Sequence, residues 1–175
     1  MDNPWIGAVS ALGGVLVGGI AEAVRARGAF RRDKGWVALQ AQRQHLENVY
    51  ETLELLADSY GQGVGGVMFV ISQGKAREGH VDTKAPWARL RMLVHLYTPW
   101  LVPHLTLVEE KGPELGAAMG KGIMAQSGDR RHDAALVDEL LLAAKPFSAA
   151  VAAMREAIIA SSRELDVSTT KAIGQ

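Results

Sequence analysis

The sequence predicts an all-α protein in which a single N-terminal transmembrane helix precedes a cytoplasmic helical bundle. Three observations support this fold class. Residues 5–24, WIGAVSALGGVLVGGIAEAV, form an apolar run without a charge before Glu22. Most of the remaining chain repeats apolar residues at spacings of three and four, the period of an amphipathic helix. The one short apolar segment that resembles a strand has no second strand to pair with, so we expect it to be helical.

The apolar run is long enough to cross a bilayer, because twenty helical residues rise about 30 Å. A positive cluster follows it, and by the positive-inside rule this order places the C-terminal domain in the cytoplasm. We therefore expect residues 1–35 to form the anchor and a membrane-surface segment. The alternatives are a signal peptide cleaved near Ala21-Glu22-Ala23 and a buried or interfacial helix. The membrane-surface residues are Arg25, Arg27, Arg31, Arg32 and Lys34.

Small residues recur along one face of the predicted anchor. Ser10, Gly14, Gly18 and Glu22 follow one another at four-residue intervals, and the two glycines form a GxxxG pair. Such a face allows close helix packing in lipid, where apolar surface alone gives no reason to associate. It therefore predicts a homo-oligomer, in which Glu22 either reaches the water at the membrane boundary or lines a shared polar path.

Residues 36–165 are expected to form the bundle, and residues 166–175 a flexible tail. The first helix of the bundle should end at Gly61, because GQGVGG interrupts the apolar pattern before a short helical segment, VMFVISQG. The polar run 75–84 should form an exposed loop that offers a site for a partner. The expected core stripe of the first helix is Trp36, Leu39, Leu46, Val49, Tyr50, Leu53, Leu56 and Tyr60.

Prolines and glycines set the next boundaries. A helix capped by Thr83 should start near Pro86 and end at Pro99. The chain then resumes through Trp100 and should stop at Gly112. The apolar side chains expected to face the core in the first of these helices are Leu90, Leu93, Val94 and Tyr97, and the second contains the apolar residues Trp100, Leu101, Leu105 and Val108.

Two further helices complete the expected bundle. A short helix over 113–126 contains Gly116 and Gly120, which predict a close helix contact. The last helix should start at Asp129 or Asp133, bend at Pro146 and end near Leu165. Its core stripe is Leu136, Leu140, Phe147, Val151, Met154 and Ile158.

Composition limits the chemistry. Lysine and arginine together equal aspartate and glutamate, 19 against 19, so no overall field attracts DNA, and the absence of cysteine removes disulfides and cysteine-based zinc sites. No phosphate loop, HExxH motif or nucleophile elbow occurs, so we expect no cofactor, no metal and no conventional enzyme. The histidines fall on separate segments: His45, His80, His95, His104 and His132.

One cationic group merits comparison with known catalysts. Arg89, Arg91 and His95 lie on one predicted helix, where Arg91 and His95 share a face and Arg89 does not. An exposed cationic ridge is one interpretation. The spacing from Arg89 to His95 also resembles the motif of HEPN ribonucleases, although Leu90 replaces the polar residue that usually follows the arginine. That resemblance implies an all-helical dimer that cleaves RNA without a metal, so any enzyme here would be of that type.

The whole layout, with RLRMLVHLYTP as its local signature, also resembles the membrane accessory protein of type VI-B CRISPR systems and related bacterial antiphage membrane proteins. This resemblance implies a HEPN-like fold that has lost nuclease activity and assembles into a membrane pore. The expected function is thus an oligomeric membrane effector or pore in antiviral defence. A partner-binding module without pore activity and a membrane-tethered ribonuclease are the alternatives. The expected partners are the bilayer, a second copy, and a cytoplasmic protein or RNA-guided effector complex.

Overall fold

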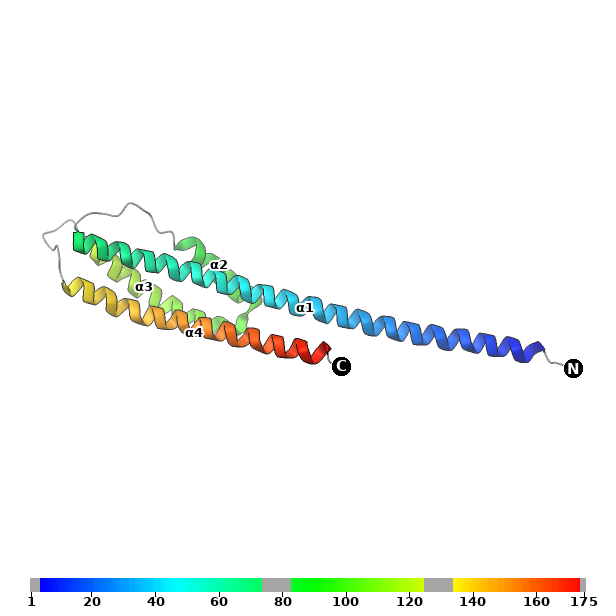
Figure 1. Cartoon of the computed structure of the whole chain (residues 1–175). Helices are drawn as coiled ribbons and strands as arrows, with labels where there is room; N and C mark the ends of the chain where they lie inside the picture. Colours follow the sequence, from blue (N-terminus) through cyan, green and yellow to red (C-terminus); the bar gives the residue numbers. More distant parts are fainter. Residues whose placement is uncertain (1–3, 74–82, 125–133, 174–175) are drawn as a thin grey trace. The chain divides into compact units, whose positions relative to one another are not determined.

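The computed structural model describes residues 4–73, 83–124 and 134–173, and the side chains of residues 35–73, 83–124 and 134–167. The described residues are helical and contain no strand, so the all-α prediction is confirmed (Figure 1). The chain divides into two compact units, Met1–Ala41 and Gln42–Gln175. The elements are α1 (Pro4–Gln73), α2 (Lys84–Tyr97), the 3₁₀ helix η1 (Pro99–Leu101), α3 (Val102–Met124) and α4 (Ala134–Ile173).

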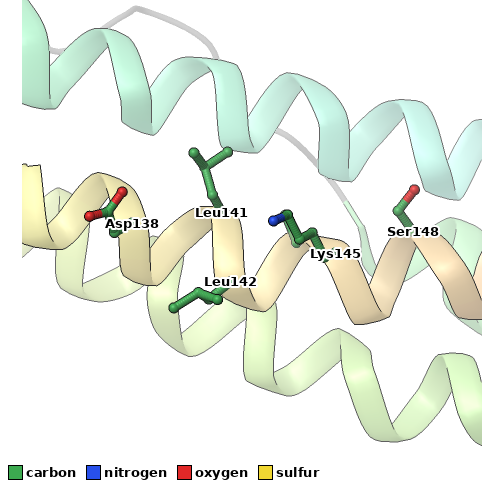
Figure 2. A pocket seen from close by; sticks show the side chains of 6 residues that line it. Asp138, Leu141, Leu142, Lys145 and Ser148 are labelled. Atoms are coloured by element: carbon green, nitrogen blue, oxygen red, sulfur yellow. The ribbon is translucent and has the colours of Figure 1, made fainter.

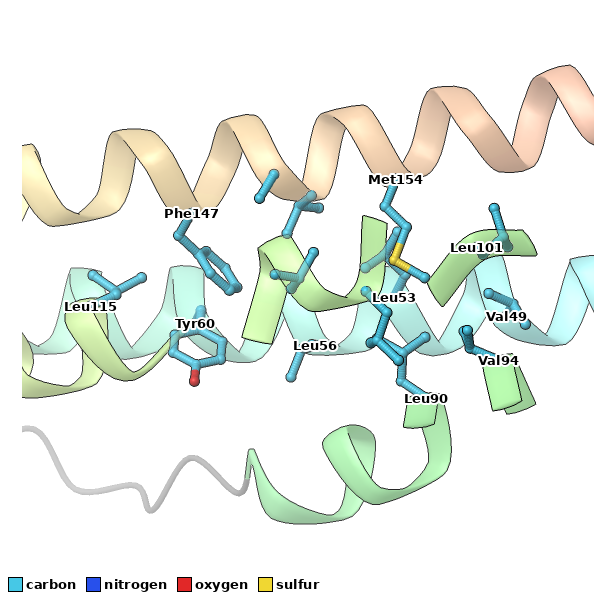
Figure 3. Packing of buried hydrophobic residues seen from close by; sticks show 14 of the residues in the cluster. Val49, Leu53, Leu56, Tyr60, Leu90, Val94, Leu101, Leu115, Phe147 and Met154 are labelled. Carbon is cyan, nitrogen blue, oxygen red and sulfur yellow. The ribbon is translucent and has the colours of Figure 1, made fainter. Parts of the chain in front are cut away.

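The second unit is a bundle with one apolar core, which Figure 3 shows between α1, α3 and α4. All four α-helices and η1 contribute to it. Burial of each large apolar side chain stabilises the fold by about 1.5–3 kcal/mol, so this core accounts for the bundle. Its most deeply buried large residues are Leu46, Val49, Leu53, Leu56, Leu90, Val94, Leu101, Leu105, Val108, Leu115, Leu140 and Met154.

Helix α1 does not end at Gly61, and that prediction is wrong. The helix continues to Gln73, and Val67, Val70 and Ile71 extend its buried stripe. Glycine costs about 1 kcal/mol in a helix interior. Packing offsets this cost at Gly63, where an added Cβ would lie 2.3 Å from Cε of Met119 on α3.

Two residues of the predicted α1 stripe precede the bundle core. Trp36 is 44% exposed and lies outside the core cluster, and Leu39 is only half-buried. The core begins at Leu46, where the rest of the predicted stripe is confirmed as buried or packed against the core.

Helix α2 follows the predicted pattern with two exceptions. Thr83 occupies the N-cap position, but its side chain makes no capping hydrogen bond. Tyr97, expected in the core, is 42% exposed and stacks on His45 of α1, with ring centroids 4.0 Å apart. Pro99 ends α2 as predicted and opens η1. Trp100 in η1 is 44% exposed, and its Nε1 donates to Ser161 Oγ at 3.2 Å.

Helix α3 is one helix where two were expected. It passes through Pro113, and the buried positions Val108, Gly112 and Leu115 keep their spacing across the proline. Pro113 itself is exposed, so water can reach the backbone carbonyl that its missing N–H leaves unpaired. Continuous burial on the opposite face therefore overrides the local break.

The close contact expected at Gly116 and Gly120 is also wrong. A Cβ at either position would meet nothing within 4 Å. The close approaches lie on the buried face of α3 instead. An added Cβ would lie 2.9 Å from the Trp87 ring at Gly112 and 2.3 Å from Cγ1 of Val67 at Gly122.

The predicted core stripe of α4 is confirmed, and Leu136 is half-buried against the core cluster. The helix continues through Pro146, and the bend expected there stays a prediction. It also continues to Ile173 rather than ending near Leu165, so the expected tail begins as helix. Arg43 of α1 pairs with Asp166 at 3.4 Å in this added stretch.

Candidate functional site

The structure gives Arg91 a packing role. Its Nε donates to the Glu109 carboxylate on α3, and its guanidinium carbon lies 5.5 Å from the centre of the Trp87 ring. The carboxylate and the ring together hold the cation at the joint between α2 and α3.

The other two residues of the HEPN-like group are not gathered into a site. Arg89 and His95 are both exposed on α2. None of the three surface hollows described below is lined by Arg89, Arg91 or His95.

The predicted residues of the anchor lie outside the described side chains, although residues 5–24 are helical as part of α1. Of the predicted partner loop, residues 75–84, positions 75–82 lie outside the described residues. Among the described residues, no helix combines the length and apolar character that a membrane span requires. Side chains are not described at the predicted anchor and membrane-surface positions Ser10, Gly14, Gly18, Glu22, Arg25, Arg27, Arg31, Arg32 and Lys34.

The described histidines do not assemble into a metal site. His45 stacks on Tyr97, and the buried Nδ1 of His104 has no hydrogen-bond partner in the described bundle. Within the described ranges, no three histidine or carboxylate side chains are grouped closely enough to hold an ion.

The most distinctive surface of the bundle is the line where α1 and α4 meet, here called the α1–α4 seam: residues 46–64 of α1 and 144–162 of α4. Two hollows lie along it. The first, of about 320 Å³, is lined by Leu46, Glu47, Tyr50, Glu51, Ile158, Ile159 and Ser162. The second, of about 280 Å³, has an apolar floor that includes Ala57, Val64, Phe147 and Val151.

An ion pair crosses the seam between the two hollows. Arg155 Nε and a terminal nitrogen donate to the two oxygens of Glu54 at 2.7 and 2.8 Å. The hydrogen bond to Glu54 is the main cause of the raised pKa of Arg155, against which burial acts. This two-point contact fixes α4 against α1 and compensates the charge of both groups.

Carboxylates follow one edge of the seam. Glu47, Glu51, Glu54 and Asp58 lie at successive spacings of four, three and four on α1, so they share a helix face. Glu47 pairs with Arg43 at 3.3 Å, and Glu54 pairs with Arg155. Glu51 and Asp58 form no ion pair with any described residue. The opposite edge carries the small or apolar residues Ser148, Ala152, Ile159 and Ser162.

A third hollow, of about 480 Å³, lies farther along α4 (Figure 2). Asp138, Leu141, Leu142 and Lys145 line it together with Ala144 and Ser148, which also belong to the second hollow. Leu142 is 67% exposed. The lining of this hollow carries one acid, Asp138, and one base, Lys145, whereas the α1 edge of the seam carries four carboxylates.

The fold and this surface define a helical-bundle protein with an apolar, acid-edged seam. The sequence already displays the register of the four carboxylates, but we did not predict the seam, because the pairing of α1 with α4 depends on tertiary packing. Comparison with protein-family models, curated proteins and solved structures finds no match to this chain.

Proposed function

We propose that the protein is a single-pass membrane protein whose helical bundle acts by binding another protein. The observation that carries this proposal is the apolar seam, which leaves two hollows open between α1 and α4. Grooves of this kind between helices receive apolar side chains of a partner. We do not propose the ribonuclease alternative, because Arg91 is paired with Glu109 and stacked on Trp87.

The anchor part of the proposal is supported by the apolar run 5–24 and the basic residues that follow it. We expect the full chain to remain in the membrane pellet after extraction at alkaline pH, which releases peripheral proteins. Replacing both Leu12 and Leu16 by arginine should shift the chain into the supernatant, since each central arginine opposes insertion by about 2.5–3.5 kcal/mol. Release of the unmodified chain would contradict the anchor.

Self-assembly in the membrane is a second candidate function. It is supported by the helical conformation of residues 4–34, because Ser10, Gly14, Gly18 and Glu22 then share one face. The mass of the full chain in mild detergent should correspond to an oligomer, and Gly14→Leu with Gly18→Leu should shift it toward the monomer. An unchanged mass would remove this face from the proposal. The pore and the defence role stay predictions that rest on the resemblance.

A further inference from the structure

We propose that the α1–α4 seam binds a basic amphipathic helix of a partner protein. This inference rests on the proposed function, because it specifies the chemistry of the protein that the bundle binds. Three features of the seam carry it: two apolar hollows, an edge on which four carboxylates face only two paired arginines, and an opposite edge of small or apolar side chains.

The two hollows set the apolar pattern of the partner. The first is lined on α1 by residues 46–51 and the second by residues 57–64. Their midpoints are about 12 residues apart, which is about 18 Å along a helix. A partner helix lying along the seam therefore presents apolar side chains about three turns apart, and it spans four to five turns. The side chains of Ser148 and Ala152 on the α4 edge are small, so they leave room for the backbone of the partner helix to approach.

The charge of the seam sets the polar pattern of the partner. Arg155 is paired with Glu54 and is also near enough to Asp58 to feel its charge, so the two carboxylates outweigh this one cation. Glu51 and Asp58 are exposed, without an ion pair to the described residues, and seven positions apart. Lysine or arginine at the same spacing on the partner would lie opposite both acids. Such complementarity favours encounter and fixes the orientation of a bound helix.

The same charges disfavour two other occupants. In a symmetric dimer with parallel anchors and facing seams, the two-fold axis sets the acidic α1 edge of each copy opposite the α4 edge of the other. That edge carries Ser148, Ala152, Ile159 and Ser162, so it supplies no positive charge to Glu51 or Asp58. An anionic lipid surface would be repelled by both acids. A basic helix of another protein is the occupant that satisfies both the apolar floor and the acidic edge.

The test uses the full chain in nanodiscs of zwitterionic phosphatidylcholine and two fluorescent 21-residue helical peptides. Both peptides carry leucine and alanine on one face. The other face carries lysine in the first peptide and glutamate in the second. Fluorescence anisotropy should show that the lysine peptide binds at least about tenfold more tightly than the glutamate peptide, and that its affinity falls as salt is added.

Charge reversal locates the binding site. Glu51→Lys with Asp58→Lys should weaken the lysine peptide about tenfold and strengthen the glutamate peptide. The control Glu110→Lys changes an exposed acid on α3, outside the lining of all three hollows, and should leave both affinities within about twofold. Circular dichroism checks that each variant stays helical.

Three results would overturn the inference: equal binding of both peptides, a Glu51/Asp58 variant that behaves like Glu110→Lys, or binding of the lysine peptide no tighter than to empty discs. If the chain fails to enter the discs, the anchor proposal fails. In that case, the same peptide titrations on the chain outside the discs still test whether the seam prefers the lysine peptide.

Discussion

Replacing Leu56 by alanine is expected to lower the free energy of unfolding by about 2–5 kcal/mol. Leu56 is fully buried in α1 and belongs to the core that α2, α3 and α4 share (Figure 3). The truncation removes apolar contacts and leaves a cavity that neighbouring helices fill only in part. The neighbouring Leu55 is 54% exposed, so Leu55→Ala is a matched control with an expected change within about 0.5 kcal/mol.

Denaturant unfolding of the full chain in mild detergent, followed by circular dichroism, measures both variants. The two substitutions remove the same atoms from adjacent positions of one helix. Their difference therefore reports burial rather than helix propensity. Equal losses at Leu55 and Leu56 would contradict the orientation of α1 in the bundle.

Two glycines of α3 are expected to respond to alanine in opposite directions. Gly122→Ala should destabilise the bundle by about 1–3 kcal/mol, because the added Cβ would lie 2.3 Å from Cγ1 of the β-branched Val67. Gly120→Ala should stabilise it by about 0.5–1 kcal/mol, because that Cβ meets nothing within 4 Å and alanine favours the helix.

The midpoints of thermal unfolding of these two variants check the prediction. Both substitutions add one methyl group to glycines two positions apart, so only the neighbourhood differs. A rise in the midpoint for Gly122→Ala would show that α3 does not approach α1 closely at Val67.

Periodicity predicted the buried faces of the bundle well. Leu90, Leu93 and Val94 of α2 and the core stripe of α4 lie where three- and four-residue spacing placed them. That spacing records which side of a helix meets the core, and this is a local property of the chain.

Helix ends and glycine contacts were predicted less well. The expected breaks at Gly61 and Gly112 assume that glycine and proline act through local preference alone. Tertiary packing overrides that preference where Gly63 meets Met119 and where Gly112 meets Trp87. Likewise, a GxxxG spacing shows that two glycines share a face, but not whether another helix covers it, as Gly116 and Gly120 demonstrate.

The candidate site depended on tertiary structure in the same way. The four carboxylates of α1 are visible in the sequence, but their position beside two apolar hollows follows from the pairing of α1 with α4. Conversely, the spacing of Arg89, Arg91 and His95 on α2 gave no sign that Arg91 contacts Glu109 and Trp87, because these contacts also depend on tertiary packing.

The topology of the chain tests the central claim most directly. Because the sequence has no cysteine, a single cysteine introduced at Asn3 or at Glu110 is the only thiol of this chain that a membrane-impermeant maleimide can label. In intact bacterial spheroplasts, the reagent should label position 3 but label position 110 only after the membrane is permeabilised. Equal labelling of both positions before permeabilisation would contradict a single-pass protein with a cytoplasmic bundle.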